Sequence, residues 1–260
     1  NVGLLTLLGH ENSREEFIRQ SLSKNVQPIF VEQDGVPTIH KKRFVDRHSG
    51  TKPFELYEMD DGALPLKTEK ELLTYIDDLI DDYDMVVVVD YGHGMMTSDV
   101  IQKLCEKSKY LSVNTQANAG NRGFNTLTRY PRADYVSIAG NELELEIRKR
   151  GQSFSDSVLE LADQIDCPRF TITLGRDGSL HYDKESGFSE VPALAVRVLD
   201  RVGAGDAVLS ITAPLVAIGL PWDVIGFIAN LAGAEIVGHL GNRNSLDRIS
   251  LSKHIEALLK

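Results

Sequence analysis

The sequence is poor in cysteine and has no long apolar run. Its two cysteines, Cys105 and Cys167, have no paired spacing, so we expect packed thiols in a reducing compartment rather than a disulfide framework. No apolar stretch approaches the roughly 20 residues of a membrane-spanning helix, and no basic segment precedes an apolar one at the N-terminus. The sequence therefore predicts a soluble, cytoplasmic protein with no membrane partner.

Positive charge is also scarce. The chain has 28 Lys and Arg residues against 38 Asp and Glu residues, which gives a formal net charge of -10. A surface with this balance does not attract polyanions in general. Nucleic acid is therefore not expected as a partner.

Strands and helices alternate along most of the chain. At 260 residues it is long enough for one large domain with a sizeable core. Residues 85–90, M-V-V-V-V-D, form a continuous apolar strand of the kind that parallel sheets bury on both faces. A buried strand is predicted at 1–9, and further strands are predicted at 110–113, 135–138, 170–174, 179–182 and 191–198, with helices between them and a helical tail after Gly205. This order predicts an α/β domain with a mostly parallel sheet.

The N-terminal third contains a different pattern. Capping boxes at 13–16 and 68–71 predict the starts of two helices. Between them, residues 26–60 carry short strand-like runs separated by Asp34-Gly35 and Ser49-Gly50 turns, at 28–32, 37–45 and 54–59. This segment is predicted to be an antiparallel insert that acts as a lid.

The strongest chemical signal is the segment from Asp200 to Asp206, D-R-V-G-A-G-D, between a predicted strand and an apolar helix. A glycine-rich turn into a helix exposes backbone N–H groups, and the helix dipole adds positive potential for a phosphate. An aspartate at this position can also accept a proton from a hydroxyl aimed at that phosphate. The alternative is an ordinary turn in which Asp206 only caps the helix.

Two further segments stand at strand ends. T-L-G-R-D-G, from Thr173 to Gly178, would let backbone and a hydroxyl approach nucleotide phosphates, although an ordinary hairpin turn is the stronger explanation of this segment taken alone. Asn141 and Glu144 share one face at a helix start, which suits an amide and a carboxylate that organise hydrated Mg²⁺. A plain helix cap is the alternative for this pair.

Taken together in this order, the three segments resemble the signatures of the PfkB or ribokinase-like carbohydrate kinases. The resemblance implies a three-layer αβα fold over residues 1–260, with a small antiparallel lid, and transfer of phosphate from ATP to a sugar or sugar phosphate. It also implies a set of roles: Asp206 as base, Gly203, Ala204 and Gly205 as anion hole, Thr173, Gly175, Gly178 and Asn230 at ATP, and Asn141 and Glu144 at Mg²⁺ through water.

Within the family, residues 37–44 and 90–94 look most like the kinase module of bacterial heptose-phosphate kinase/ADP-heptose synthases. This implies contacts to the acceptor from Lys41, Arg43 and His93, although a loop histidine explains His93 equally well. Arg201 stands where the signature usually has Thr, and the family's first strands and Gly-Gly segment are missing ahead of residue 1. A nucleotide-binding regulatory module of the same fold is therefore the alternative function.

A lid with an unpaired edge also recruits other strands. The expected assembly is a homodimer formed through residues 37–45, against the alternative of a solvated basic patch on a mobile loop.

Overall fold

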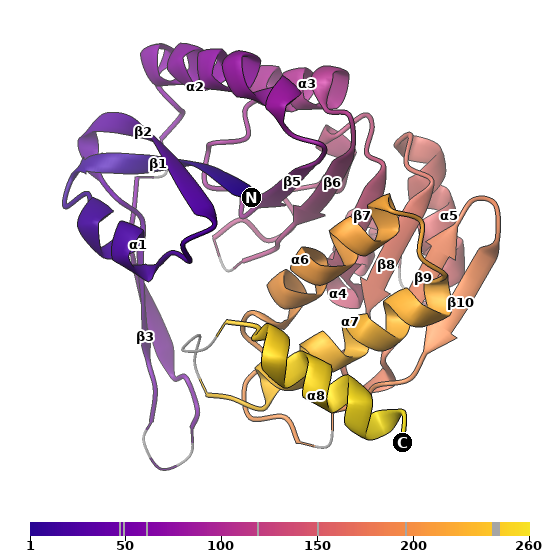
Figure 1. Ribbon diagram of the computed structural model, residues 1–260. Coiled ribbons are helices and arrows are strands. Elements are labelled where there is room, and N and C mark those ends of the chain that lie inside the picture. The colour runs from indigo at the N-terminus through magenta and orange to yellow at the C-terminus, as the bar shows by residue number, and fades with distance from the viewer. Residues whose placement is uncertain are drawn as a thin grey trace. The chain divides into compact units, whose positions relative to one another are not determined.

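The computed structural model describes residues 1–46, 48, 50–60, 62–118, 120–149, 151–195, 197–240 and 245–260. The chain divides into two compact units. Unit 1 contains residues 1–79 and 93–103, and unit 2 contains residues 80–92 and 104–260. Figure 1 labels their elements along the chain.

Unit 1 begins with a parallel strand pair. Strand β1 (Val2–Glu11) pairs with β2 (Val26–Pro37), and helix α1 (Glu15–Ser21) connects them. Strands β3 (His40–Phe44) and β4 (Phe54–Glu58) then form an antiparallel hairpin, which we call the lid hairpin. Helix α2 (Leu66–Leu79) packs on β2, where Val31 and Leu72 are both fully buried.

The predicted antiparallel insert at 26–60 is therefore only partly correct. Its first run belongs to β2, which is parallel to β1 because α1 returns the chain to the starting end of the pair. The opening strand is also less covered than predicted, since Leu8 is buried whereas Val2 is half exposed.

Both predicted capping boxes are wrong. Helix α1 starts after Arg14, which adopts a left-handed conformation with φ of 57° and makes no side-chain cap. Helix α2 starts at Leu66, so Thr68 lies inside its first turn and Glu69 N donates to Pro65 O (2.9 Å). A proline before the first helical residue sets the entry to α2 without a side-chain cap.

Unit 2 is built on a six-stranded sheet of order β10-β9-β8-β7-β6-β5. The parallel strands are β5 (Val86–Asp90), β6 (Leu111–Thr115), β7 (Tyr135–Ala139) and β8 (Arg169–Thr173). Strands β9 (Ser179–Asp183) and β10 (Gly187–Val191) complete one edge in antiparallel pairing. The predicted parallel core is thus confirmed, with an antiparallel extension.

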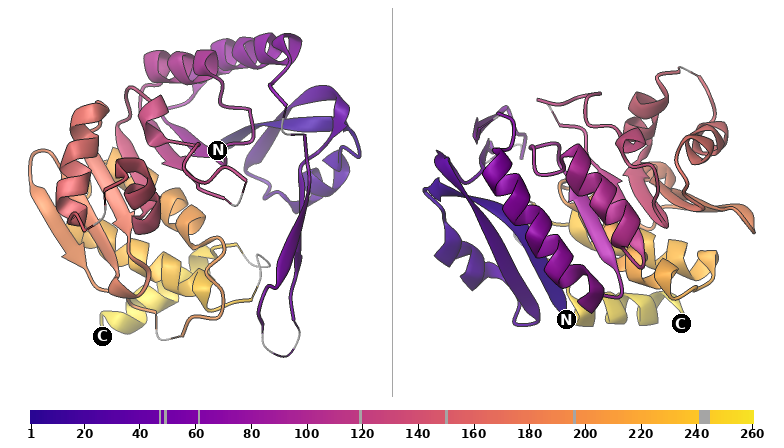
Figure 2. Two further views of the ribbon diagram at one scale, coloured as in Figure 1. Left: turned by 180° about the vertical axis from the view of Figure 1, so that it is seen from behind. Right: turned by 90° about the horizontal axis from the view of Figure 1, so that it is seen from above.

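Helices cover both faces of this sheet, as Figures 1 and 2 show. Helices α4 (Gly140–Ile147) and α5 (Phe154–Gln164) lie on one face, and α6 (Ala204–Ala217), α7 (Trp222–Val237) and α8 (Arg248–Leu258) lie on the other. Helix α3 (Ser98–Lys107) follows β5. Short 3₁₀ helices lie between α2 and β5 (Ile80–Asp82), between β6 and β7 (Leu127–Arg129) and between β8 and β9 (Gly175–Asp177). The predicted three-layer αβα arrangement is confirmed in unit 2.

The core of unit 2 forms where α6 crosses β7. Tyr135, Leu209 and Ala213 are almost completely buried there, and Tyr135 OH donates to Thr212 Oγ1 (2.7 Å). Burial at about 25 cal/mol per Å² of apolar surface stabilises this contact, and the hydroxyl pair removes the cost of an unsatisfied buried tyrosine. The contact fixes α6, and with it the Gly-rich segment at its start.

One predicted strand is misplaced. The strand expected at 191–198 is β10, at 187–191, and the described residues from 192 to 199 form no strand. A tight turn after Asp183, whose Oδ1 accepts from Glu185 N (2.8 Å), brings the next strand earlier, and Pro192 has no N–H group to continue the ladder.

Cys105 and Cys167 are buried free thiols, as predicted. Among the described residues, no helix combines the length and the apolar character that crossing a bilayer requires.

Candidate active site

The N-terminus of α6 has the geometry of an anion-binding turn. Gly203 stands at the N-cap with φ of 83°, a left-handed conformation that favours glycine. The buried Asp200 carboxylate accepts from Val202 N (3.1 Å) and so fixes the turn ahead of it. The Gly-rich segment is therefore held in one conformation at the start of the helix.

The helical hydrogen-bond ladder begins only at Ala207 N, which donates to Gly203 O (3.0 Å). The amides of Gly205 and Asp206 belong to the first turn, where helix geometry leaves N–H groups without intrahelical acceptors. The space beside the Gly205 Cα is open. The N–H groups of this turn can therefore donate hydrogen bonds to a phosphate oxygen.

Asp206 lies in the first turn of α6 and is half buried. Its Oδ1 atom accepts two side-chain hydrogen bonds, one from Gln116 Nε2 (2.5 Å) and one from Tyr91 OH (3.2 Å). Tyr91 directly follows β5 and Gln116 directly follows β6, so both come from the carboxyl ends of parallel strands. Ligands bind at this edge in open α/β sheets.

The loops that carry these two donors are held by Asp90. Its carboxylate is 3% exposed and accepts from Gly92 N (2.8 Å) and Tyr130 OH (2.8 Å), with Arg129 Nη1 at 3.4 Å. Burial and the neighbouring Asp90 charge raise the pKa of Tyr130, so its hydroxyl remains a donor. The Asp90 carbonyl accepts from Gln116 N (2.8 Å), which joins the two strand ends.

Asparagine side chains fasten the loop after β6 to the loop after β5. Asn118 Nδ2 and Asn121 Nδ2 donate to Tyr91 O at 2.8 and 2.7 Å, and Asn125 Nδ2 donates to Asp90 O at 2.8 Å. A Cβ atom on Gly92 would lie 2.1 Å from Asn121 Nδ2. Only glycine allows this close approach.

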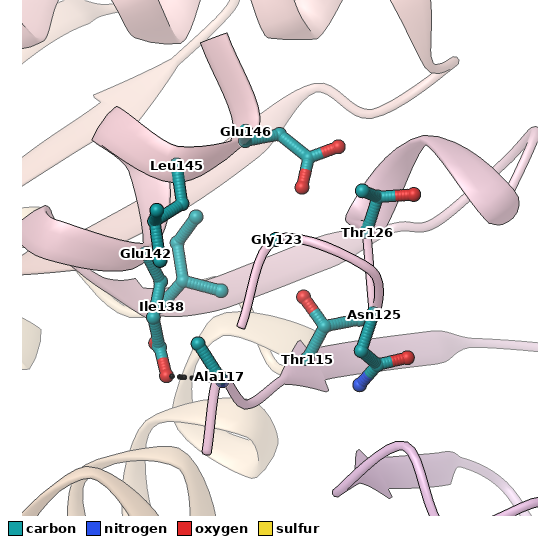
Figure 3. A pocket seen from close by; sticks show the side chains of 9 residues that line it. All are labelled: Thr115, Ala117, Gly123, Asn125, Thr126, Ile138, Glu142, Leu145 and Glu146. Atoms are coloured by element: carbon teal, nitrogen blue, oxygen red, sulfur yellow. Dashed lines mark hydrogen bonds between the residues drawn. The ribbon is translucent and has the colours of Figure 1, made fainter. Parts of the chain in front are cut away.

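Glu142 is the acidic residue of α4 that lies nearest this edge. Its carboxylate accepts from Ala139 N (2.8 Å) and Ala117 N (3.2 Å), and Figure 3 shows the second of these bonds beside a small cavity. Burial raises the pKa of Glu142, and the nearby Asp206 charge acts in the same direction. The cavity has a volume of about 10 Å³, which is about the space that one water molecule needs.

The predicted metal pair has a different environment from Glu142. Asn141 and Glu144 lie on α4, as expected, and both are exposed. Within the described part of the chain, no group of three or more His, Cys, Asp or Glu side chains could enclose a metal ion. The exposed pair suits contact through water, which Mg²⁺ retains readily.

The predicted nucleotide turn follows β8. Leu174 N donates to Gly178 O (2.8 Å), which closes a tight turn between two antiparallel strands. Gly175 has φ of 62° and open space beside it, whereas a Cβ on Gly178 would lie 2.1 Å from Val191 O. Packing alone therefore explains Gly178, while Gly175 leaves room for a ligand.

The side-chain NH₂ group of Asn230, on α7, is hydrogen-bonded within the protein. Its Nδ2 donates to Ser179 Oγ (2.8 Å) and Gly226 O (2.9 Å). Ser179 Oγ in turn contacts His181 Nε2 (2.8 Å), and His181 Nδ1 contacts Thr171 Oγ1 (2.9 Å). Burial lowers the pKa of His181 to about 4, so this imidazole is neutral near pH 7.

The predicted acceptor contacts lie in unit 1. Lys41 and Arg43 share one face of the lid hairpin, where Lys41 Nζ lies 5.1 Å from the centre of the Tyr57 ring and Arg43 Nε bonds Glu55 Oε1 at 2.5 Å. Burial lowers the pKa of Lys41, and the Arg43 charge acts in the same direction. His93 is half buried in the loop between β5 and α3.

The sequence alone predicts no site role for Tyr91, Gln116 or Glu142. The signal for the first two was their position, since each directly follows a strand of the parallel sheet. Glu142 could not be distinguished from Glu144 in N-E-L-E, because the sequence alone does not show which of the two glutamates turns inward.

Comparisons with known proteins identify the family. The family model described as "pfkB family carbohydrate kinase" matches residues 1–249. The chain is 24% identical over 242 residues to the bifunctional protein HldE of Histophilus somni and 28% identical over 247 residues to that of Campylobacter jejuni subsp. doylei. These matches cover 92% and 91% of the chain, but only 49% and 51% of the relatives, so the chain spans about half their length.

Solved structures show the same fold. Phosphofructokinase-2 from Escherichia coli in complex with potassium matches with a TM-score of 0.77 and 16% identity, over 99% of this chain and 82% of that one. Ribokinase from Thermotoga maritima matches with a TM-score of 0.75 and 17% identity, over 98% and 81%. From the family match over nearly its whole length, the chain belongs to the pfkB family of carbohydrate kinases.

Proposed function

We propose that this chain transfers the terminal phosphoryl group of ATP to a hydroxyl of a sugar or sugar phosphate, with Asp206 as the general base. The observation that carries the proposal is the position of Asp206 in the first turn of α6, beside amides that have no intrahelical acceptor. Asp206 can then accept the proton of the acceptor hydroxyl while the neighbouring turn binds the phosphoryl group that this hydroxyl attacks.

In this mechanism the acceptor hydroxyl gives its proton to the Asp206 carboxylate as its oxygen bonds to phosphorus. The bond between phosphorus and the bridging oxygen of ATP breaks, and ADP leaves with the electron pair. The N–H groups of the turn at Gly203, Ala204 and Gly205 stabilise the negative charge that spreads over the phosphoryl oxygens. The Ala204 N–H donates to Arg201 O (3.3 Å), so it would have to share or exchange that hydrogen bond. The protein thus contributes position and electrostatic stabilisation, which phosphoryl transfer mainly requires.

Mg²⁺ would neutralise charge on the phosphates, and Asn141 and Glu144 would hold it through water. The proposed ATP-binding residues are Thr173, Gly175, Gly178 and Asn230. The open space at Gly175 supports this role most directly. Asn230 would act through its carbonyl oxygen, because its amide N–H groups are directed at Ser179 and Gly226.

We assign acceptor binding to Lys41, Arg43 and His93, in one kinase domain that covers residues 1–260 with the 26–60 segment as its lid. A phosphorylated sugar is favoured because Lys41 and Arg43 place two cations on one face of the lid hairpin. The likeness to HldE proteins makes a heptose phosphate the first acceptor to test. Glu55 competes for Arg43, so the acceptor phosphate would have to displace or share that ion pair.

The proposed assembly is a cytoplasmic homodimer formed through the lid hairpin. Phe44 and Phe54 stack at 4.4 Å between ring centres, yet they are 39% and 53% exposed, and Leu56 on the same face is 55% exposed. These three residues form an exposed apolar patch at one end of a face that also carries His40, Lys42 and Glu58, and such a patch on a two-stranded sheet favours pairing. The Ile39→Asp, Phe44→Asp double variant should sediment as a monomer with unchanged far-ultraviolet circular dichroism, and a parent that is monomeric at micromolar concentrations contradicts the dimer.

The kinase proposal is tested by two measurements on the parent chain. Calorimetry should detect binding of ATP with Mg²⁺, and ADP release should be stimulated by at least one of heptose 7-phosphate, fructose 6-phosphate and ribose. Binding of ATP without turnover of any acceptor would favour the regulatory nucleotide-binding alternative. A folded chain that binds no ATP would contradict both.

A further inference from the structure

The donors around Asp206 converge on one of its two oxygens. Gln116 Nε2 lies 2.5 Å and Tyr91 OH lies 3.2 Å from Oδ1. No described residue donates a side-chain hydrogen bond to Oδ2. The two oxygens of one carboxylate therefore have different environments.

Gln116 is fixed by its own main chain. Its N–H donates to Asp90 O (2.8 Å), and its carbonyl lies 3.5 Å from Asn125 Nδ2. The orientation of the side-chain amide follows from chemistry, because an ionised carboxylate only accepts hydrogen bonds and so must face the NH₂ group. The loop itself is held by backbone groups and by asparagines, so it does not depend on the Gln116 amide.

We propose that Gln116, assisted by Tyr91, is a positioning residue that holds Oδ1 of Asp206 and leaves Oδ2 as the atom that accepts the proton. This inference rests on the proposed base role of Asp206. When Oδ2 becomes protonated, Oδ1 becomes the carbonyl oxygen of the acid and still accepts both hydrogen bonds. The proton can therefore arrive without any rearrangement of the donors.

The neutrality of both donors matters to the chemistry. A cation beside a carboxylate would favour its ionised form strongly and weaken it as a proton acceptor. An amide and a phenol hold the same oxygen with hydrogen bonds of smaller electrostatic effect.

The experiment compares Gln116→Met, which keeps the side-chain length but has no donor, with Gln152→Met as the matched control. Gln152 donates to Glu160 on α5 (3.1 Å), away from Asp206. Gln116→Met should lower kcat about tenfold and leave the KM for ATP within twofold, because it removes an interaction of the base rather than of the nucleotide. Tyr91→Phe should lower kcat about threefold, and Gln152→Met should change neither value.

A pH profile separates positioning from a structural role. Gln116→Glu places a second carboxylate against Asp206, and two carboxylates that share a site hold a proton to higher pH. The acid limb of kcat/KM should therefore move upward by about one pH unit, with heptose 7-phosphate or whichever tested sugar turns over as acceptor. An unmoved limb, or Gln116→Met kinetics equal to those of Gln152→Met, overturns the inference.

Two controls keep the inference distinct from the proposed function. If Asp206→Asn retains parental turnover, the base role fails and the inference fails with it. If Asp206→Asn is inactive but Gln116→Met is not impaired, only the inference fails. If the parent turns over none of the three acceptors, carboxyl ¹³C titration of Asp206 decides: a change in its titration midpoint in Gln116→Glu supports the contact, and an unchanged midpoint overturns it.

Discussion

The sheet edge of unit 2 and the lid hairpin of unit 1 are both polar regions with predicted site residues, but they are built differently. At the sheet edge, Asp90 is 3% exposed. Its carboxylate accepts hydrogen bonds from Gly92 N and Tyr130 OH, and its carbonyl oxygen accepts from Gln116 N and Asn125 Nδ2. On the lid hairpin, the Arg43–Glu55 pair is about one-third exposed, and its contacts, including the hydrogen bond from Tyr57 OH to Glu55 Oε2 (2.6 Å), stay within the two strands of the hairpin. The comparison indicates that the proposed base lies beside a densely hydrogen-bonded network, while the proposed acceptor contacts lie on a more exposed surface element that can adapt.

The largest effect expected from this contrast is on stability. Asp90→Ala should lower the free energy of unfolding by about 3 kcal/mol, because it leaves the buried Tyr130 hydroxyl without its acceptor and removes the longer of two contacts of Arg129 Nη1, which also donates to Asn125 Oδ1. Arg43→Ala, the matched change on the lid hairpin, should cost less than about 1 kcal/mol, as exposed ion pairs do. Urea denaturation of both variants measures the difference, and equal losses would remove the distinction between the two regions.

His181 extends the contrast to pH. Its pKa is lowered to about 4 by burial, from 6.5, so protonation favours the unfolded chain. Its contribution is fully present above about pH 6.5 and is lost as the pH falls toward 4, an effect on the order of 3 kcal/mol. The difference in unfolding free energy between parent and His181→Gln should change across that window. Parallel pH curves for the two proteins would show that His181 does not titrate in this way.

Gly178 and Gly187 provide a smaller and more local test. Both have positive φ, 93° and 81°, but only Gly178 would direct a Cβ into backbone, 2.1 Å from Val191 O. Gly178→Ala should therefore be destabilised by about 2 kcal/mol, and Gly187→Ala by about 1 kcal/mol from the left-handed conformation alone. Thermal unfolding distinguishes them. Equal losses would mean that the chain at 191–193 moves to accept the methyl group, and would contradict the packing explanation of Gly178.

The parts of the fold that follow from local sequence were predictable. The apolar run at 86–90 gave β5, and the glycines of D-R-V-G-A-G-D gave the turn into α6, because each depends on neighbouring residues only. The parallel pairing of β2 was not predictable in this way, since a short helix rather than a tight turn joins it to β1. The strand predicted at 191–198 was misplaced for a similar reason. The turn stabilised by Asp183 makes β10 begin at Gly187, and the prediction did not include this turn.

In the candidate site, too, the residues in a local motif were predictable and the contacts between distant segments were not. Asp206 could be found from its motif, but its contact with Gln116 joins residues 90 positions apart and needs β5, β6 and α6 to be in place. The inward glutamate of α4 is Glu142 because its carboxylate reaches the amides of Ala139 and Ala117, whereas Glu144 is exposed. Local sequence indicates the proposed base, and the tertiary structure brings its hydrogen-bond donors to it.

The central claim is that Asp206 accepts the proton, and Asp206→Asn tests it most directly. Asparagine preserves the shape of the side chain but removes the proton acceptor, so phosphoryl transfer should fall by roughly 10² to 10⁴-fold while ATP affinity stays within a few fold. The measurement is the steady-state rate of ADP formation with the acceptor that the parent turns over, together with calorimetric ATP binding by both proteins. Rates within threefold of the parent would contradict the account.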